Sequence, residues 1–470
     1  MNVLGIIAEF NPLHTGHEYL IEKLRRETGA DFCIVVMSGD YVQRGEPAFF
    51  SKTLRTQAAL LSGADLVLEL PLSVSTGSAE YFAEGAVSLL DHLGCVTHLG
   101  FGSESGDIRG FQLAGKLLSE EPEDYRRLLQ SNLKVGMNFP KARYEALSTY
   151  LSLPQRSKED HCGVQDGTAW YPSSLKEPAS ENSIFSPENL SGILSLLESP
   201  NNILGVEYCK ALHKMRSSIK PVTVKRLGAG YHDSLTGSDR GCAADNSANF
   251  RYASASGLRK AFLSAQNASF SGEADPGEAG ITSLMQDYVP APCRSLYVRA
   301  LQENRYVTFD QFFLPLYHIL QYSDVEILSG YQDITESFAA RLLKLFGTCS
   351  SMTELCSALK ARNLTSAGTG RMLLHILLNL KKEAVEAERQ QGLALYARIL
   401  GFRQEAKPLL SEIDRNADIP LVTKTADASR VLSPLALSQL ERTIKASELY
   451  RAAMPGARSE SEYVQNIIIF

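Results

Sequence analysis

Two histidines near the start of the chain are the first side chains that could do chemistry. They lie in AEFNPLHTGH, residues 8–17, with Thr15 and Gly16 between His14 and His17. Histidine pairs that bind zinc from one helix are normally four residues apart, so this spacing disfavours a metal site. A structural pair with satisfied hydrogen bonds and a phosphate-binding pair both stay open.

The elements expected on either side of this segment favour phosphate. Residues 3–8 form a short apolar run, and residues 17–26, HEYLIEKLRR, place apolar side chains at helical spacing. A helix that begins near Thr15 directs unpaired backbone N–H groups and its positive dipole end at an anion. Gly16 allows a close approach because it has no Cβ, and the imidazoles can donate N–H groups to phosphate oxygens. The segment therefore predicts a strand-to-helix phosphate cradle.

Apolar runs alternate with helical patterns through the first hundred residues. The sequence predicts strands at 32–37, 64–70 and 96–101 and helices at 52–62 and 80–93. Further helices are expected at 187–197 and 202–216, and a further strand at 221–225. Continuous apolar strands joined by helices predict an α/β fold with a Rossmann-like, doubly wound parallel sheet.

The chain divides into two expected domains. Residues 1–265 form the α/β catalytic domain, with a polar, Ser- and Pro-rich insertion at about 153–187. Two more polar loops are expected at 236–249 and 266–280. Residues 281–470 form a mainly helical C-terminal domain, in which 371–388, RMLLHILLNLKKEAVEAE, reads as one helix.

Composition excludes several classes of protein. The chain has 470 residues, of which 44% are hydrophobic and 21% charged, as in ordinary globular proteins. No run reaches the ~18 apolar residues of a membrane helix, and the first residues carry no basic leader, so we expect a cytoplasmic protein. The net charge of −6 argues against a general nucleic-acid coat. The eight cysteines show no CxxC spacing, which disfavours a structural metal.

Seven motifs in order carry a family resemblance. ExFxPxHxGH after the first strand resembles the signature of the HIGH-type nucleotidyltransferases, with Asn11 where an Asp is usual and Glu9 between Ala8 and Phe10. The remaining motifs narrow the match to the bacterial tRNA(Met) cytidine acetate ligase family. They are MSGDYVQRGEPAFFSKTLRTQAAL (37–60), ADLVLELP (64–71), GFGSE (100–104), PNNILGVEY (200–208), VKRLGAGYHD (224–233) and YASASGLRKAF (252–262).

The resemblance implies an activity in two steps. ATP, with Mg²⁺ expected on its phosphates, activates acetate to acetyl-adenylate. The acetyl group then passes to N4 of the wobble cytidine of elongator tRNA(Met), giving N4-acetylcytidine. Adenylation needs positioning and charge stabilisation rather than a covalent nucleophile, which agrees with the predicted phosphate cradle.

The resemblance also assigns site residues. His14 and His17 are expected to contact the phosphates and stabilise the departing pyrophosphate. Gly102, the arginine at 226, and either Asn201 or Asn202 are expected at the nucleotide. The loop and helix start that match the family's ATP-binding segment are Ile7, Ala8, Glu9, Phe10, Asn11, Pro12, Leu13, His14, Thr15, Gly16, His17, Glu18, Tyr19 and Leu20.

Several further residues are candidates for substrate or tRNA contact. Gln43 and Arg44 lie on the Gly-rich loop with Glu46, and Lys52 and Arg55 lie one helical turn apart. Arg259 could face the triphosphate, while Ser254 and Ser256 could line the site or cap a helix. Phosphate contact in the C-terminal part would need cations such as Arg362, Arg371 and Arg398. Solvated surface roles stay open for these residues.

Two other functions compete with the tRNA ligase. One is a nucleotidyltransferase that makes a small-molecule nucleotide product, and the other is a non-catalytic tRNA-binding protein. The long C-terminal part argues against the first, and the intact ExFxPxHxGH segment argues against the second.

Overall fold

The computed structural model of the chain describes all residues except 153–186, 198, 227–253, 271–283, 362–363 and 457–460. The predicted insertion therefore lies almost entirely outside the described residues. The predicted loop at 236–249 and Arg362 lie outside them as well.

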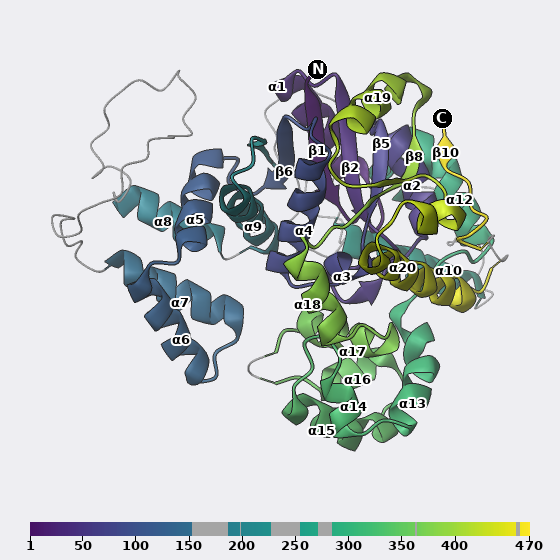
Figure 1. Cartoon of the computed structure of the whole chain (residues 1–470). Coiled ribbons are helices and arrows are strands. Elements are labelled where there is room, and N and C mark those ends of the chain that lie inside the picture. Colours follow the sequence, from purple (N-terminus) through teal and green to yellow (C-terminus); the bar gives the residue numbers. More distant parts are fainter. Residues whose placement is uncertain (153–186, 198, 227–253, 271–283, 362–363, 457–460) are drawn as a thin grey trace.

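A twisted sheet with eight strands in the described chain forms the centre of the molecule (Figure 1). Five strands run parallel in the order β5-β2-β1-β6-β7, so the chain moves outward from β1 in both directions. Their bounds are β1 Val3–Ala8, β2 Phe32–Ser38, β5 Leu66–Leu70, β6 His98–Ser103 and β7 Lys220–Lys225. The predicted doubly wound parallel sheet is confirmed.

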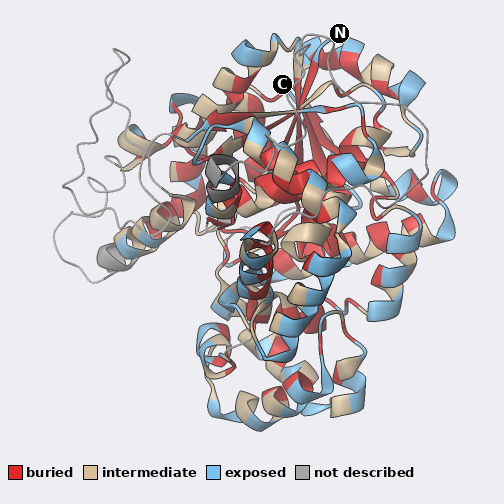
Figure 2. Cartoon of the chain, turned by 90° about the vertical axis from the view of Figure 1, so that its left-hand side faces the viewer, coloured by how far each residue is buried: buried red, intermediate tan, exposed pale blue. Residues whose placement is uncertain are grey.

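Both faces of these strands are buried. Ile34, Val36 and Leu68 point into one core cluster, whereas Val35, Met37 and Val67 point into another on the opposite face. This alternation follows from the two-residue period of a strand. It explains why the strands read as unbroken apolar runs, and Figure 2 shows the buried strands enclosed by partly exposed helices.

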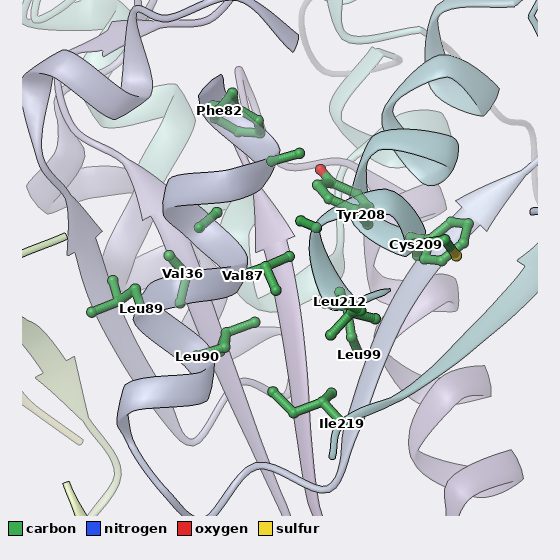
Figure 3. Packing of buried hydrophobic residues seen from close by; sticks show 14 of the residues in the cluster. Val36, Phe82, Val87, Leu89, Leu90, Leu99, Tyr208, Cys209, Leu212 and Ile219 are labelled. Atoms are coloured by element: carbon green, nitrogen blue, oxygen red, sulfur yellow. The ribbon is translucent and has the colours of Figure 1, made fainter. Parts of the chain in front are cut away.

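Helices cover each face of the sheet. The cluster on one face includes residues of α4 and α9, whose packing Figure 3 shows through Val87, Leu90 and Leu212. The cluster on the other face includes residues of α1, α2, α10 and α12. The bounds of these six helices are α1 Thr15–Thr28, α2 Lys52–Leu61, α4 Ala79–His92, α9 Pro200–Met215, α10 Ala255–Phe270 and α12 Arg294–Gln302.

Two groups of helices extend from this core (Figure 1). The first is α5 Ile108–Glu120, α6 Glu123–Lys134, α7 Phe139–Ser152 and α8 Pro187–Leu196. The second has its own apolar cluster and is called the helical lobe here. It consists of η3 Phe309–Phe312, α13 Phe313–Gln321, α14 Val325–Ser329, α15 Glu336–Leu345, η4 Phe346–Thr348, α16 Met352–Ala358, α17 Ser366–Leu377 and α18 Lys382–Gln390.

The C-terminal part returns to the sheet. β8 Ala397–Phe402 pairs antiparallel with β5, and β9 Leu421–Val422 and β10 Ile468–Ile469 both pair with β8. The last 190 residues thus supply strands as well as the predicted helices. The other elements are β3 Tyr41–Val42, β4 Glu46–Pro47, α3 Leu72–Ser75, η2 Ala291–Cys293, η5 Gln404–Ala406, α19 Lys407–Asn416, η6 Thr425–Arg430 and α20 Pro434–Ala453.

Most predicted elements are present, with three differences. The fourth predicted strand is shifted from 96–101 to His98–Ser103, so Gly102 lies inside β6. The single helix predicted for 371–388 is wrong, because α17 ends at Leu377 and α18 begins at Lys382. Asn379 between them has a φ of 53°, a left-handed conformation that Asn adopts more readily than most residues and that ends a helix. The predicted loop from 266 also begins too early, since α10 continues to Phe270.

The helical lobe contacts the β3–β4 hairpin through two glycines. Gly45 has a φ of 78°, and a Cβ on it would overlap the backbone of α17 at Ala367 and Arg371. A Cβ on Gly370 would in turn overlap the carbonyl oxygen of Gly45. Arg371 Nη1 also donates a hydrogen bond of 3.1 Å to the carbonyl oxygen of Gln43. The hairpin is therefore held against α17 by direct backbone contact.

We expect Gly370→Ala to destabilise the protein despite the better helix propensity of alanine. The methyl group must push α17 away from the hairpin, and such overpacking costs about 1–3 kcal/mol. A lower thermal unfolding midpoint would show it. Gly347→Ala is the matched control, because a Cβ there meets no atom within 4 Å. Equal midpoints for the two variants would contradict the prediction.

Candidate active site

A cleft of about 590 Å³ lies where β1 and β6 end. The chain leaves β1 in opposite directions on its two sides, and open α/β sheets bind ligands at such a switch point. Sixteen of the predicted site residues line this cleft: Ile7, Ala8, Glu9, Phe10, Asn11, His14, Gly16, His17, Tyr19, Leu20, Gln43, Arg44, Gly102, Asn201, Arg226 and Arg259.

The two histidines cap the first turn of α1. His14 is the N-cap residue, and its Nδ1 accepts a hydrogen bond of 3.1 Å from the backbone N–H of Gly16. His17 Nδ1 accepts one of 3.2 Å from the backbone N–H of His14. The ring centroids are 3.9 Å apart. The pair thus caps the helix, and both rings also line the cleft, so the phosphate role stays a prediction.

These hydrogen bonds fix which nitrogen carries the proton. Because each Nδ1 accepts an N–H, the proton of the neutral ring lies on Nε2, which is then a donor. Burial, aided by the charge of Arg226, lowers the pKa of His14 to about 3. Burial, His14 and Arg226 hold the pKa of His17 well below its usual range. At neutral pH both rings are therefore uncharged, and each presents an Nε2–H donor to the cleft.

The loop before α1 is held in place from several sides. Phe10 has a φ of 47°, an unusual backbone conformation for a bulky residue. The side chain of Asn11 accepts a hydrogen bond of 2.7 Å from the backbone N–H of Phe49, and its carbonyl oxygen accepts one of 2.7 Å from Arg259. A strained loop that is fixed in this manner is typical of a preorganised binding site.

Gly102 and Arg226 form the wall of the cleft on the β6–β7 side. A Cβ on Gly102 would lie 3.3 Å from Cγ of Arg226 and 3.6 Å from Cδ1 of Leu20, so the strand passes close to both. Arg226 follows β7 directly, and its backbone N–H donates to the carbonyl oxygen of Ser103 at 2.8 Å. A guanidinium here can bind phosphate oxygens bidentately.

The structure separates the two candidate asparagines. Asn201 lines the cleft in the first turn of α9. Asn202 is 4% exposed, and its Oδ1 accepts a hydrogen bond of 3.0 Å from the backbone N–H of Glu104, in the loop after β6. Asn201 is thus in position to contact a nucleotide, whereas Asn202 supports the loop.

This difference gives opposite expectations for two alanine variants. Asn201→Ala should weaken ATP binding by about fivefold to tenfold, the value of one hydrogen bond, with an unchanged unfolding midpoint. Asn202→Ala should lower the midpoint because it leaves the Glu104 N–H without its partner. Isothermal titration with ATP and thermal unfolding measure the two effects. Lost affinity in Asn202→Ala alone would contradict the assignment.

The hairpin and α10 form the opposite wall. Arg259 Nη2 lies 2.5 Å from Oε1 of Glu46, which pairs α10 with β4. Glu9 Oε1 accepts a hydrogen bond of 2.7 Å from the backbone N–H of Gln43. Ser254 Oγ accepts one of 3.1 Å from the N–H of Gly257, so Ser254 caps α10, and both Ser254 and Ser256 also line the cleft.

Some predicted site residues lie elsewhere. Pro12, Leu13, Thr15, Glu18 and Asn202 do not line the cleft, although they flank residues that do. Arg371 is half-buried at the junction of the hairpin and the helical lobe, where it donates to Gln43.

The predictions that Lys52 and Arg398 contact substrate or tRNA are wrong, whereas Arg55 does place positive charge beside the site, at the carbonyl oxygen of Glu9. Lys52 is 1% exposed, and its Nζ lies 2.7 Å from Glu69 and 2.8 Å from Glu462. Arg398 is buried on β8 and pairs with the same two carboxylates at 2.7 Å each. Arg55 is fully buried and donates to backbone carbonyl oxygens, among them that of Glu9. Substrate cannot reach these cations because sheet and C-terminal segments enclose them.

Sequence reasoning missed the contribution of the helical lobe to the cleft. Side chains from 309 and from α16 to α17 complete the lining, namely Phe309, Thr353, Cys356, Ser357, Lys360, Ser366, Ala367 and Gly370. They belong to segments far from the N-terminal motifs, and the helical period that builds α16 and α17 says nothing about which residues face the cleft.

Neither a metal cluster nor a membrane-spanning helix is present in the described residues. That part of the chain holds no group of three or more His, Cys, Asp or Glu side chains placed to bind a metal ion. None of its helices is long and apolar enough to cross a membrane.

A family model for HIGH nucleotidyl transferases matches residues 1–466. The chain belongs to this family. The match confirms the resemblance to this family that the motifs suggested.

Relatives of full length extend the comparison within the HIGH nucleotidyl transferases. The chain is 33% identical to the tRNA(Met) cytidine acetate ligase of Acetivibrio thermocellus and 34% identical to that of Clostridium perfringens strain SM101, each over 100% of both chains. Its structure matches Thermotoga maritima TmcAL bound with alpha-thio ATP at a TM-score of 0.81 and 28% identity, with both chains fully covered. The apo form of that protein matches at 0.82.

Proposed function

We propose that this protein activates acetate with ATP and transfers the acetyl group to N4 of the wobble cytidine of elongator tRNA(Met). The observation that carries the proposal is the cleft at the end of β1, where His14 and His17 present Nε2–H donors at the N-terminus of α1. The full-length relatives named tRNA(Met) cytidine acetate ligase supply the identity of the substrates.

The cleft suits the adenylation step. An acetate oxygen attacks the α-phosphorus of ATP, the bond from that phosphorus to the bridging oxygen breaks, and pyrophosphate leaves. Negative charge grows on the leaving group, where the imidazole donors, the first N–H groups of α1 and Arg226 can stabilise it. Asn201 and Gly102 lie on the β6 side of the cleft, which we assign to the nucleoside.

Acetyl transfer takes place on the same intermediate. The N4 amine of cytosine attacks the acetyl carbon, a C–N bond forms, and the bond from the acetyl group to the phosphate oxygen breaks with AMP as the leaving group. The cytidine must leave the anticodon-loop stack to reach this carbon. The hairpin and the helical lobe, with Lys360 at the cleft, border the side from which tRNA would approach.

Magnesium fits this cleft as a counterion of ATP rather than as a resident metal. Glu9 and Glu46 are the only carboxylates among the described lining residues, and Glu46 is paired with Arg259. Phosphate oxygens and water would therefore supply most ligands of Mg²⁺. ATP and tRNA as substrates also agree with the expected cytoplasmic location.

Labelled acetate tests the proposed function. The protein is incubated with ATP, labelled acetate and an elongator tRNA(Met) transcript, and the digested tRNA is searched for labelled N4-acetylcytidine. A transcript with uridine at the wobble position is the control and should stay unlabelled. Unlabelled tRNA in the presence of ATP binding would overturn the proposal. A new nucleotide product from a small acceptor would instead support the nucleotidyltransferase alternative.

A further inference from the structure

We propose that the Glu9 carboxylate accepts the proton that N4 of cytidine loses during acetyl transfer. This inference rests on the proposed function and assigns a further catalytic residue to its second step. Cytosine N4 is a poor nucleophile because its lone pair is conjugated with the ring, so removal of a proton as the C–N bond forms is a natural point for general base catalysis.

Glu9 stands between the two walls of the cleft. It follows β1 directly, and β1 has β6 on one side and β2 on the other. Gly102, Asn201 and Arg226 lie on the β6–β7 side, whereas Glu9 Oε1 is bonded to the hairpin at Gln43. The hairpin contacts the helical lobe, so the carboxylate lies on the side of the cleft that the nucleotide leaves open for a second substrate.

The Glu9 carboxylate can accept more hydrogen bonds than the one it receives from Gln43. Two oxygens offer about four acceptor positions, and in the described structure the N–H of Gln43 uses one of them. Because Glu9 lines the cleft and its side chain is only partly exposed, a substrate amine can meet the remaining positions away from bulk water.

The other titratable groups of the described lining are poorer proton acceptors. His14 and His17 use Nδ1 for backbone N–H groups and carry a proton on Nε2, so neither neutral ring has a free lone pair. Glu46 is held by Arg259 at 2.5 Å. Burial, with a contribution from Asp310, raises the pKa of the Cys356 thiol to about 12. Burial raises the pKa of the Tyr208 phenol, which therefore keeps its proton at neutral pH.

The surroundings of Glu9 also favour basicity. Burial raises the pKa of Glu9, and Arg44 and the N–H of Gln43 offset this only in part. A carboxylate with a raised pKa holds a transferred proton better than an ordinary one. The charged and titratable groups that act on Glu9 come from the hairpin, α2, α9, α10 and α17, and they are Arg44, Glu46, Arg55, Tyr208, Arg259 and Arg371.

Glu9→Gln separates this role from a structural one. The amide oxygen still accepts the Gln43 N–H, so the hairpin keeps its anchor, but an amide cannot accept the proton. Acetyl-adenylate formation is measured by acetate-dependent exchange of labelled pyrophosphate into ATP. Transfer is measured in a single turnover from preformed acetyl-adenylate to the tRNA transcript. Glu22→Gln is the matched control, since Glu22 is exposed on α1 and paired with Arg26.

We expect transfer in Glu9→Gln to be slower by about 100-fold or more, the usual contribution of a general base, and pyrophosphate exchange to fall much less than transfer. In wild type the transfer rate should fall as acid protonates Glu9, and this inflection should be missing from the variant. Transfer at the wild-type rate, or an equal loss of exchange and transfer, would overturn the role of Glu9. Wild-type protein that makes neither acetyl-adenylate nor N4-acetylcytidine would overturn the proposed function itself.

Discussion

His17→Ala should slow acetate-dependent pyrophosphate exchange by about 100-fold to 1,000-fold. That is the loss found when one preorganised donor to a developing negative charge is removed. His17 Nε2–H is such a donor, because the Nδ1 of the ring is engaged by the backbone N–H of His14. His14→Ala should lose a similar factor in exchange. It should also cost about 1 kcal/mol in stability, since His14 is the N-cap of α1.

Two measurements show whether this loss is chemical. The unfolding midpoint of His17→Ala should fall only by the loss of one hydrogen bond to the backbone N–H of His14, about 1 kcal/mol, while the exchange rate falls far more. His318→Ala is the matched control, because His318 is exposed on α13, does not line the cleft and packs against the ring of Tyr322. If the exchange rate of His17→Ala were within about threefold of the wild-type rate, His17 would not stabilise the departing pyrophosphate.

Lys52→Met should destabilise the protein by about 3–5 kcal/mol, the cost of breaking a buried ion pair from one side. Lys52 and Arg398 together neutralise Glu69 and Glu462, and Nζ of Lys52 also donates to Ser447 at 2.9 Å. Methionine fills the volume but leaves two buried carboxylates with a single cation. Equilibrium denaturation by urea measures the loss. Lys23→Met, which breaks an exposed pair with Glu27, should cost less than about 1 kcal/mol.

The same cluster predicts a dependence of stability on pH. Burial raises the pKa of Glu462, but Lys52 and Arg398 outweigh it and lower this pKa to about 2. The unfolded value is about 4.3, so the folded state binds the proton less tightly. The stabilisation is therefore fully present above the unfolded pKa and is lost as the pH falls toward 2. Lys52→Met should flatten this acid limb, and an unchanged limb would show that Lys52 does not set the pKa.

The sequence by itself determined the features that depend only on neighbours in the chain, namely the strands, the helices and the predicted phosphate cradle. The apolar runs of β1 and β2 need burial on both faces wherever they lie, and the alternation of strands and helices predicts that the N-terminal strands pair in parallel. The cradle at His14 to His17 is also local, because the strand, the turn and the first helical turn lie within about fifteen residues. Motif and structure therefore agree on the centre of the site.

Only the tertiary structure decided what depends on residues far apart in the chain. Lys52 is followed by Arg55 at helical spacing, as on many solvated helices, yet Glu69, Ser447 and Glu462 come from other segments and bury it. The choice between Asn201 and Asn202 depends on how α9 is rotated against the β6 loop. The lining from α16 and α17 depends on backbone contact between Gly45 and Gly370. A residue type and its local spacing fix a conformation, but whether a charge is buried or reaches a ligand is set by the partners that packing brings to it.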